Sequence, residues 1–289
     1  MSLQWYPGHM VKARRELAAL MPSQDVVIEV IDARLPVASS NPLITELRRD
    51  KPCIKVLTKS DLADPAVTTA WVKHFSTFPN VRAFASSTKA PQETRRRITQ
   101  LSNGLARHRG TDKTVRALIA GVPNVGKSTL INTLMNRTVA KVGDKPAVTK
   151  EQQAVKLKSG MTITDSPGLM WPKIEDEHRA FRLAIAGSIP DTAIDYLTIA
   201  MFAAEFFLAR YPDVVVARYK LRETPPSAEA LLAEVGQRRG GLLPGGRVDL
   251  HKAAEMLVHE FRAGVLGRIS LEAPPAAAEP AEPAEPAGD

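Results

Sequence analysis

One segment of the sequence has the residue types and the spacing of a phosphate-binding loop. Residues 121–128 read Gly-Val-Pro-Asn-Val-Gly-Lys-Ser and fit G-x-x-x-x-G-K-[ST], between a strand pattern at 115–120 and a helical pattern at 128–136. Backbone N–H groups of such a loop bind phosphate oxygens, and the helix N-terminus adds favourable dipole charge. We expect Lys127 to reach the β- and γ-phosphates and Ser128 to hold Mg²⁺. The expected nucleotide ligands in this segment are Asn124, Val125, Gly126, Lys127, Ser128 and Thr129.

A Lys-x-Asp motif at 59–61 indicates the base that this loop serves. The motif follows an apolar strand pattern at 54–57 and Thr58. Guanine presents two donors, N1–H and the 2-amino group, which one ionised carboxylate accepts together, whereas adenine has no such edge. We therefore expect Asp61 to read guanine, with the Lys59 stem along the ring; the alternative is an ordinary turn in which Asp61 caps a helix. The N–H groups expected at the guanine oxygen follow the next strand pattern, 81–85, at Ser86 and Ser87.

Two further segments contain expected ligands of the metal and of the γ-phosphate. Asp165 follows a strand pattern at 161–164 and would bind Mg²⁺ through water, and the Gly168 N–H would meet the γ-phosphate. Thr149 lies between the phosphate loop and this motif, so we expect it to bind Mg²⁺ and the γ-phosphate in the triphosphate state only. In many GTPases a glutamine follows the glycine and orients the attacking water, but Leu169 stands here and cannot hydrogen-bond through its side chain.

The order of these motifs along the chain is unusual. GTPases usually place the phosphate loop first and the base-reading Lys-x-Asp last, whereas Asp61 precedes Lys127 by about sixty residues in this sequence. Because each motif is intact, we expect a circularly permuted P-loop GTPase domain. In such a domain the segment after Asp165 leads directly into the C-terminal part of the chain.

The hydrophobic pattern predicts the elements that must position these residues. Up to about residue 174, strand and helix patterns alternate, which predicts an α/β domain with a mostly parallel sheet flanked by helices. A further strand is expected at 26–31, a hairpin at 155–157 with 161–164, and helices at 9–20, 41–49, 66–77, 91–107 and 128–136. Later helices are expected at 176–187, 191–210, 227–238 and 249–263. We therefore expect a GTPase domain at 1–174, a C-terminal all-α domain at 175–272 and a disordered Ala/Glu/Pro tail at 273–289.

Composition and charge exclude several protein classes. The single cysteine, Cys53, excludes an intramolecular disulfide framework and favours a reducing compartment, and its apolar neighbours predict an inert buried thiol. No uninterrupted apolar run of membrane-spanning length occurs, and the N-terminus lacks the pattern of an export signal, so a cytoplasmic protein without a membrane partner is expected. The net charge is +8, or +12 for residues 1–272, which favours a polyanionic partner.

The sequence resembles the YlqF/RbgA family of circularly permuted bacterial GTPases that act in assembly of the large ribosomal subunit. The resemblance covers about residues 5–272 and rests on the segments 5–10 (Trp-Tyr-Pro-Gly-His-Met), 32–36 with 41–42, 146–153, 170–173 and 264–268. Three residues depart from the family pattern, and none of them removes a charged ligand. These are Thr58 in place of the usual Asn, Ser87 in place of a frequent Ala, and Ala147 in place of a usual Gly.

The resemblance implies a catalytic role for His9 and a second role for Asn124. His9 would reach the nucleotide and act as the catalytic group, since a neutral imidazole can align water or accept its proton near pH 7; the alternative is a surface histidine beside a basic helix. Asn124 would help to bind K⁺, which supplies positive charge near the leaving group; the alternative is a side chain that only stabilises the loop.

The expected function is that of a GTPase that binds a maturing large (50S) ribosomal subunit, through rRNA and ribosomal proteins, while it carries GTP. Basic residues within 91–113 and along the C-terminal helices suit phosphate backbones. GTP/GDP, Mg²⁺ and K⁺ are the expected ligands, a monomer is expected, and DNA is not an expected partner. The alternatives are a GTPase acting on another RNA such as tRNA, a nucleotide-gated RNA-binding protein with negligible hydrolysis, and an ATP-using kinase.

Overall fold

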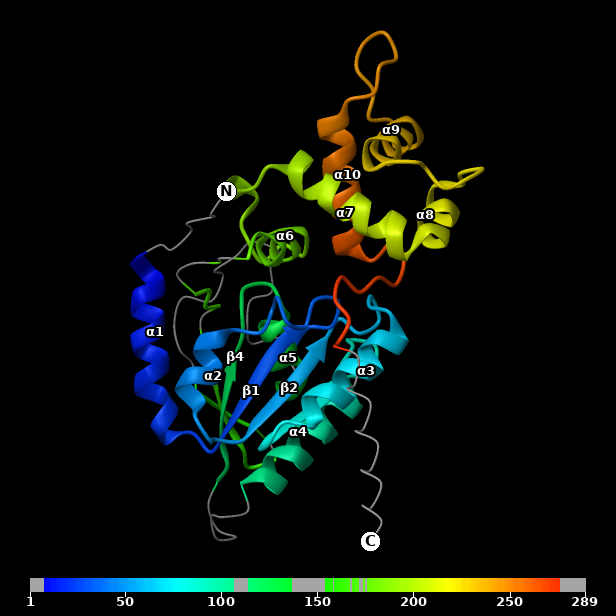
Figure 1. Ribbon diagram of the computed structural model, residues 1–289. Coiled ribbons are helices and arrows are strands. Elements are labelled where there is room, and N and C mark those ends of the chain that lie inside the picture. The colour runs from blue at the N-terminus through cyan, green and yellow to red at the C-terminus, as the bar shows by residue number, and fades with distance from the viewer. Residues whose placement is uncertain are drawn as a thin grey trace, which may run out of the picture.

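A six-stranded sheet occupies the lower part of the molecule in Figure 1, and a group of helices lies above its upper edge. The computed structural model describes residues 8–106, 114–136, 154–157, 159–166, 168–171, 174 and 176–275, with residues 8–10, 12 and 13 by their backbone alone. The strand order is β3–β2–β1–β4–β6–β5; β5 is antiparallel to β6, and the other neighbours are parallel. The strands are Val26–Asp32 (β1), Cys53–Thr58 (β2), Val81–Ala85 (β3), Arg116–Ala120 (β4), Ala154–Lys156 (β5) and Thr162–Asp165 (β6).

The predicted strands are all present, and the expected hairpin is the β5–β6 pair. All seven residues of β1 are buried, because helices cover both faces of a parallel sheet. In the register of β1 with β2, Asp32 pairs with Thr58. The polar residues that end these two apolar strands therefore reach the same edge of the sheet.

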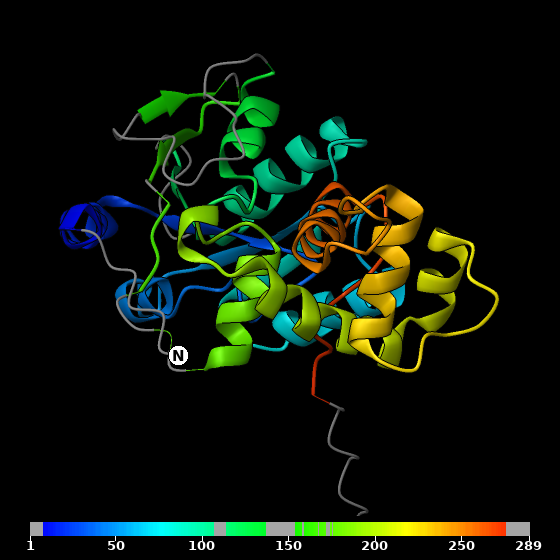
Figure 2. The same cartoon turned by 90° about the horizontal axis from the view of Figure 1, so that it is seen from above.

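Helices cover the sheet on both faces. In Figure 2, α2 (Pro42–Arg48) and α3 (Pro65–Ser76) lie on one face, and α4 (Pro91–Leu105) and α5 (Lys127–Met135) lie on the other. α1 (Gly8–Leu20) ends in a short 3-10 turn, Met21–Ser23, and lies beside α2, where Arg14 is 3.5 Å from Glu46. These helices confirm the predicted α/β architecture.

The upper part of the molecule is helical, as predicted, but its helices differ from the sequence pattern in two places. The expected helix at 191–210 is divided, because Asp195 accepts the N–H groups of Leu197 and Thr198 and starts a new helix. A helix at Pro212–Tyr219 was not predicted, because Pro212 was interpreted as a break; proline in the first turn of a helix needs no N–H partner. The elements are α6 (Glu177–Ile185), a 3-10 turn (Asp191–Ala193), α7 (Tyr196–Arg210), α8 (Pro212–Tyr219), α9 (Ala228–Arg239) and α10 (Leu250–Ala263).

The chain returns to the sheet after α10, as the orange to red segment of Figure 1 shows. The Leu271 N–H donates to the carbonyl oxygen of Arg34 at 2.6 Å, directly beyond β1. The Glu272 carboxylate accepts the N–H groups of Val37 and Ala38. Among the residues that the structure describes, no helix is long and apolar enough to cross a bilayer.

Candidate nucleotide-binding site

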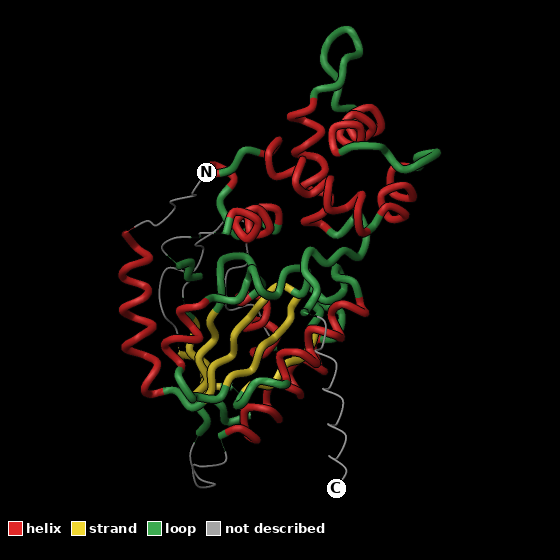
Figure 3. Tube along the Cα trace, viewed as in Figure 1, coloured by secondary structure: helices red, strands yellow, loops and turns green. Residues whose placement is uncertain are grey.

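The loops that follow β1, β2, β4 and β6 meet at the upper edge of the sheet, where the yellow strands of Figure 3 end. The base-reading motif and the phosphate loop are joined there. The Thr58 hydroxyl donates to the carbonyl oxygen of Val125 at 2.5 Å, and the Lys59 ammonium donates to that of Asn124 at 2.8 Å. The structure therefore brings together the two halves of the predicted site, although they are far apart in the sequence.

The backbone of the phosphate loop requires glycine at one close contact and residues that adopt a left-handed conformation at two other positions. A Cβ atom at Gly121 would lie 2.4 Å from the carbonyl oxygen of Val30, so glycine is needed where the loop crosses β1. Asn124 (φ 59°) and Gly126 (φ 101°) are left-handed, which asparagine and glycine tolerate best. α5 begins at Lys127, so the positive end of its dipole faces the loop. This backbone can bind an anion such as a phosphate group.

Lys127 and Asp165 form the charged side of the loop. The buried Lys127 ammonium donates to the carbonyl oxygen of Val122 at 2.7 Å, and a Cβ atom at Gly168 would lie 3.2 Å from its Nζ. Burial lowers the pKa of Lys127 to about 8, although the Asp165 carboxylate opposes this shift. Burial likewise raises the pKa of Asp165 to about 6, against the Lys127 ammonium and the Ser166 N–H. Burial therefore disfavours the charged form of both groups. A bound phosphate would stabilise the Lys127 ammonium, and a bound cation would stabilise the Asp165 carboxylate.

The Asp165 carboxylate fits a divalent cation. Its Oδ1 atom is buried and accepts no hydrogen bond from the described part of the chain. A buried carboxylate oxygen without a donor is unfavourable, and Mg²⁺ prefers oxygen ligands of this kind. Ser128, the second predicted ligand, lies half-buried in the first turn of α5. The residues present therefore fit Mg²⁺.

Asp61 does not cap α3. The cap is Asp64, whose carboxylate accepts the N–H groups of Ala66 at 2.9 Å and Val67 at 3.2 Å. The Asp61 side chain is 17 % exposed, and its nearest ionic partner is the exposed Lys89, at 3.4 Å. The alternative interpretation of Asp61 as a helix cap is therefore wrong, and its carboxylate is accessible to a base.

The loop after β3 contains the two serines expected at the guanine oxygen. The Ser86 N–H donates to the carbonyl oxygen of Leu57 at 2.8 Å, and the Ser86 carbonyl accepts the hydroxyl of Ser60 at 3.0 Å. Ser86 therefore fixes this loop to β2. Because the Ser86 N–H already donates to Leu57, the Ser87 N–H is the one that we still expect to contact the guanine oxygen.

Buried polar residues at the end of β1 and in the segment after it make contacts that the sequence pattern did not indicate. Asp32 accepts the Lys59 ammonium at 2.9 Å and forms a two-point ion pair with Arg34. Asn41 donates to the carbonyl oxygen of Leu169 at 2.6 Å and so fixes the segment after Gly168. They lie in the segments 32–36 and 41–42, on which the family resemblance partly rests, but no chemical role was predicted for them.

The remaining predicted site residues are placed only in part. The Asn124 amide donates to the carbonyl oxygen of Gly187 at 2.7 Å, just beyond α6, and Thr129 is half-buried in α5. His9 belongs to α1, but its side chain lies outside the described residues, as does the whole of Thr149. Most of the predicted tail, from residue 276 onward, also lies outside them.

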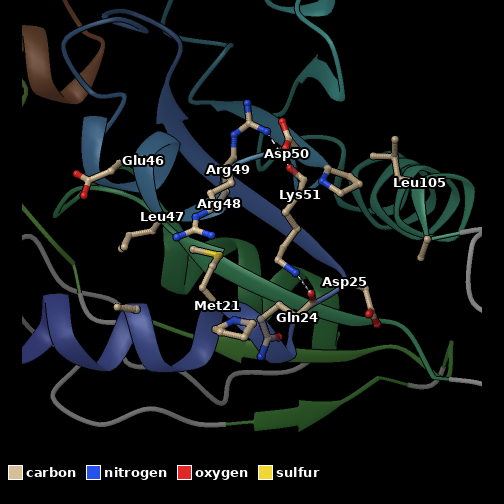
Figure 4. Close-up of a pocket in the computed structure, with 14 residues that line it drawn as sticks. Met21, Gln24, Asp25, Glu46, Leu47, Arg48, Arg49, Asp50, Lys51 and Leu105 are labelled. Atoms are coloured by element: carbon tan, nitrogen blue, oxygen red, sulfur yellow. Dashed lines mark hydrogen bonds between the residues drawn. The ribbon is translucent and has the colours of Figure 1, made fainter.

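A pocket of about 810 Å³ lies at the opposite, lower edge of the sheet (Figure 4). Its walls come from the end of α1 and the segment before β1, from the end of α2 and the segment before β2, and from the end of α4. Lys51 reaches across it to the carbonyl oxygen of Gln24. None of the predicted site residues lines this pocket.

Comparison with known proteins agrees with this geometry. Residues 116–200 match the family described as 50S ribosome-binding GTPase. Ribosome biogenesis GTPase A of Priestia megaterium is 38 % identical over 288 residues, covering 97 % of this chain and 100 % of that protein. The protein of the same name from Thermotoga maritima is 32 % identical over 272 residues, covering 94 % and 95 %.

Solved structures of similar fold lead to the same family. GDP-bound YlqF has a TM-score of 0.67 and 29 % identity, covering 90 % of this chain and 99 % of that one. GNP-bound YlqF from T. maritima has a TM-score of 0.65 and 29 % identity, covering 91 % and 98 %. The predicted fold, family and GTPase activity are confirmed: this chain is a GTP hydrolase with a role in ribosome assembly. It belongs to the YlqF/RbgA family of ribosome biogenesis GTPases.

Proposed function

We propose that this GTPase acts in the maturation of the large (50S) ribosomal subunit and binds rRNA in a nucleotide-dependent way. The observation that carries the proposal is the pair of hydrogen bonds that joins Thr58 and Lys59 to the phosphate loop, which supports one nucleotide site that binds both guanine and phosphate. The similarity of residues 116–200 to 50S ribosome-binding GTPases supports the choice of subunit.

In the proposed complex, the Asp61 carboxylate accepts the two guanine donors, and Lys59, beside Thr58, lies along the ring. The Ser87 amide meets the guanine oxygen, and Gly168 meets the γ-phosphate. The phosphates lie on the loop and the start of α5. The residues proposed to bind them there are Asn124, Val125, Gly126, Lys127, Ser128 and Thr129.

Ser128, Thr149 and Asp165 are the residues proposed to hold Mg²⁺. When bound, this ion neutralises charge on the β- and γ-phosphates. The buried Oδ1 of Asp165, without a donor among the described residues, supports its assignment. Asn124, whose amide nitrogen donates to the carbonyl oxygen of Gly187, is the residue proposed to help bind K⁺.

Hydrolysis needs a group that orients water for attack on the γ-phosphorus, which breaks the bond to the β-phosphate oxygen and leaves GDP and phosphate. Leu169, at the position where many GTPases have glutamine, is buried and apolar, and its N–H lies 3.3 Å from the carbonyl oxygen of Gly121. The resemblance to the YlqF/RbgA family implies His9 as this group, and we propose it for the catalytic role. A neutral imidazole can accept a hydrogen bond from water and receive its proton.

We further propose that residues 1–174 form the GTPase domain, that 175–272 form an RNA-binding domain, and that 273–289 form a disordered tail. Arg238, Arg247 and Lys252 of the helical part supply positive charge for a phosphate backbone. The proposed partners are rRNA and ribosomal proteins in the cytoplasm. We also propose that the protein is a monomer and has neither DNA nor a membrane as a partner. tRNA is the second candidate RNA.

The test is GTP turnover of the full chain alone and with purified 50S subunits, 30S subunits or tRNA. We expect 50S subunits alone to raise the rate, and to do so in K⁺ but not in Na⁺. Equal turnover with 50S and 30S subunits contradicts the proposed partner, and stimulation by tRNA favours the second candidate. His9→Ala should abolish the stimulated rate while GTP affinity stays near wild type, and the exposed His251→Ala is the matched control.

A further inference from the structure

The C-terminal end of α10 lies directly against the loop that contains Lys59 and Asp61, and the buried Arg34 links this end of α10 to Lys59 through Asp32. We propose that Arg34 is a positioning residue of the nucleotide site, which holds Lys59 in place and takes its own position from the end of α10. The inference rests on the proposed function, because it requires Lys59 to bind the nucleotide.

Arg34 is only 1 % exposed and makes a forked contact with Asp32. Its Nε lies 3.0 Å from Oδ1 and one terminal nitrogen lies 2.8 Å from Oδ2. The other terminal nitrogen donates to the carbonyl oxygen of Phe261 at 3.0 Å, in the last turn of α10, and the Phe261 ring lies 4.6 Å from the guanidinium. Such a planar fork fixes both partners in orientation, which a lysine ammonium cannot do.

Asp32 links Arg34 to the proposed nucleotide site, because it also binds Lys59. Its Oδ2 atom, which binds Arg34, also accepts the Lys59 ammonium at 2.9 Å. The same ammonium donates to the phosphate-loop carbonyl of Asn124. The two cations hold the pKa of the buried Asp32 far below its usual range although burial opposes this, so the carboxylate stays ionised. A displaced Arg34 would therefore leave Lys59 without its fixed anchor.

The end of α10 also touches the base-reading loop directly. A Cβ atom at Gly264, the left-handed residue that ends α10, would lie 2.5 Å from the Leu62 side chain. The Ile269 N–H donates to the carbonyl oxygen of Leu62 at 3.2 Å. The loop that contains Lys59 and Asp61 is thus held from the helical part at two places, through Arg34 and through Leu62.

A double-mutant cycle tests this coupling. The dissociation constant of a fluorescent GDP analogue is measured for the full chain, for Lys59→Met, for Arg34→Lys and for the double variant, with thermal unfolding recorded for each. We expect each single variant to weaken binding about tenfold, since each loses hydrogen bonds to a charged group. The double variant should bind no more weakly than Lys59→Met alone, because Arg34 acts through Lys59.

If the two effects multiply, Arg34 has only a structural role and the inference is overturned. If Lys59→Met binds GDP like the wild type, the proposed nucleotide site is wrong as well. The matched control is Arg218→Lys, which alters an ion pair with Glu260 of α10 at 2.8 Å and should leave GDP affinity unchanged. A similar loss in this control, coupled to Lys59→Met, also overturns the inference.

A second cycle applies if Arg34→Lys does not fold. Phe261→Leu removes the ring beside the Arg34 guanidinium and keeps an apolar side chain in the core. We expect it to weaken GDP binding in the wild type and to have no further effect in Lys59→Met. Equal effects in both backgrounds overturn the inference.

Discussion

The two edges of the sheet differ in whether their charged side chains are buried or exposed. At the upper edge, Asp32, Arg34 and Lys127 are buried, and each makes a defined polar contact. At the lower edge, the pocket of about 810 Å³ is lined by Arg49 and Asp50, which are exposed to solvent. Burial of a charge is unfavourable unless a partner compensates for it, so a protein retains it mainly where function needs it. Buried charge and close backbone contacts therefore distinguish the edge at which we propose the nucleotide site.

Lys127→Met is the strongest test of this comparison. Loss of a buried charged donor should weaken GDP and GTP binding roughly 100-fold, whereas the free protein should keep its stability because the buried ammonium is costly. Titration with a fluorescent nucleotide and thermal unfolding measure the two effects. Lys51→Met, at the lower edge, is the control and should bind like the wild type; a comparable loss there would remove the distinction between the edges.

Asp61→Asn should change which base is bound. The amide can donate to a xanthine oxygen but cannot accept both guanine donors, so GDP should bind roughly 10 to 100 times more weakly and XDP more tightly. Competition titrations with GDP and XDP measure the preference. Asp64→Ala removes the neighbouring cap of α3 and should lower stability by about 1 kcal/mol without changing the preferred base. An unchanged preference in Asp61→Asn would show that this carboxylate does not read the base.

Asn41→Ala should affect both stability and turnover. It removes the cap of α2 and the contact with the Leu169 carbonyl, which together should cost about 2 kcal/mol of unfolding free energy. GTP turnover should fall because the segment after Gly168 loses its anchor. Ser227→Ala, which removes the cap of α9, should lower stability alone. Turnover that follows stability equally in both variants would contradict a special role for Asn41.

Arg49→Gly should have the smallest effect and the opposite sign. Arg49 adopts φ 50° and ψ −123°, a conformation that favours glycine, and it is exposed in the wall of the lower pocket. We expect the free energy of unfolding to rise by about 1 kcal/mol, with GDP affinity unchanged. Denaturant unfolding measures the change. Destabilisation, or weaker GDP binding, would mean that this strained residue serves a function at the lower edge.

Sequence patterns predicted the sheet well, because its strands are apolar runs between clear turns. β3 has the predicted bounds of 81–85, and the phosphate loop has the predicted flanking elements. The helix at Pro212–Tyr219 was missed because proline both ends and begins helices, and local sequence does not distinguish the two.

The site could be predicted only where a motif carries its own chemistry. The predictions for Lys127 and Asp61 come from such motifs, whereas the role proposed for Arg34 depends on a carbonyl group 227 residues later in the chain. No local pattern contains that contact. Contacts of this kind arise from tertiary packing, and a single sequence does not reveal them.

The segment that returns from α10 to the sheet has a consequence for synthesis. Ile269 and Leu271 hold the loops that contain Leu62 and Arg34, yet a translating ribosome adds them after every strand and helix of the structure described. During translation, β2 and the phosphate loop are synthesised long before Ile269, which holds the loop after β2. The loops that contain Leu62 and Arg34 therefore gain these two hydrogen bonds only after every described strand and helix has been synthesised.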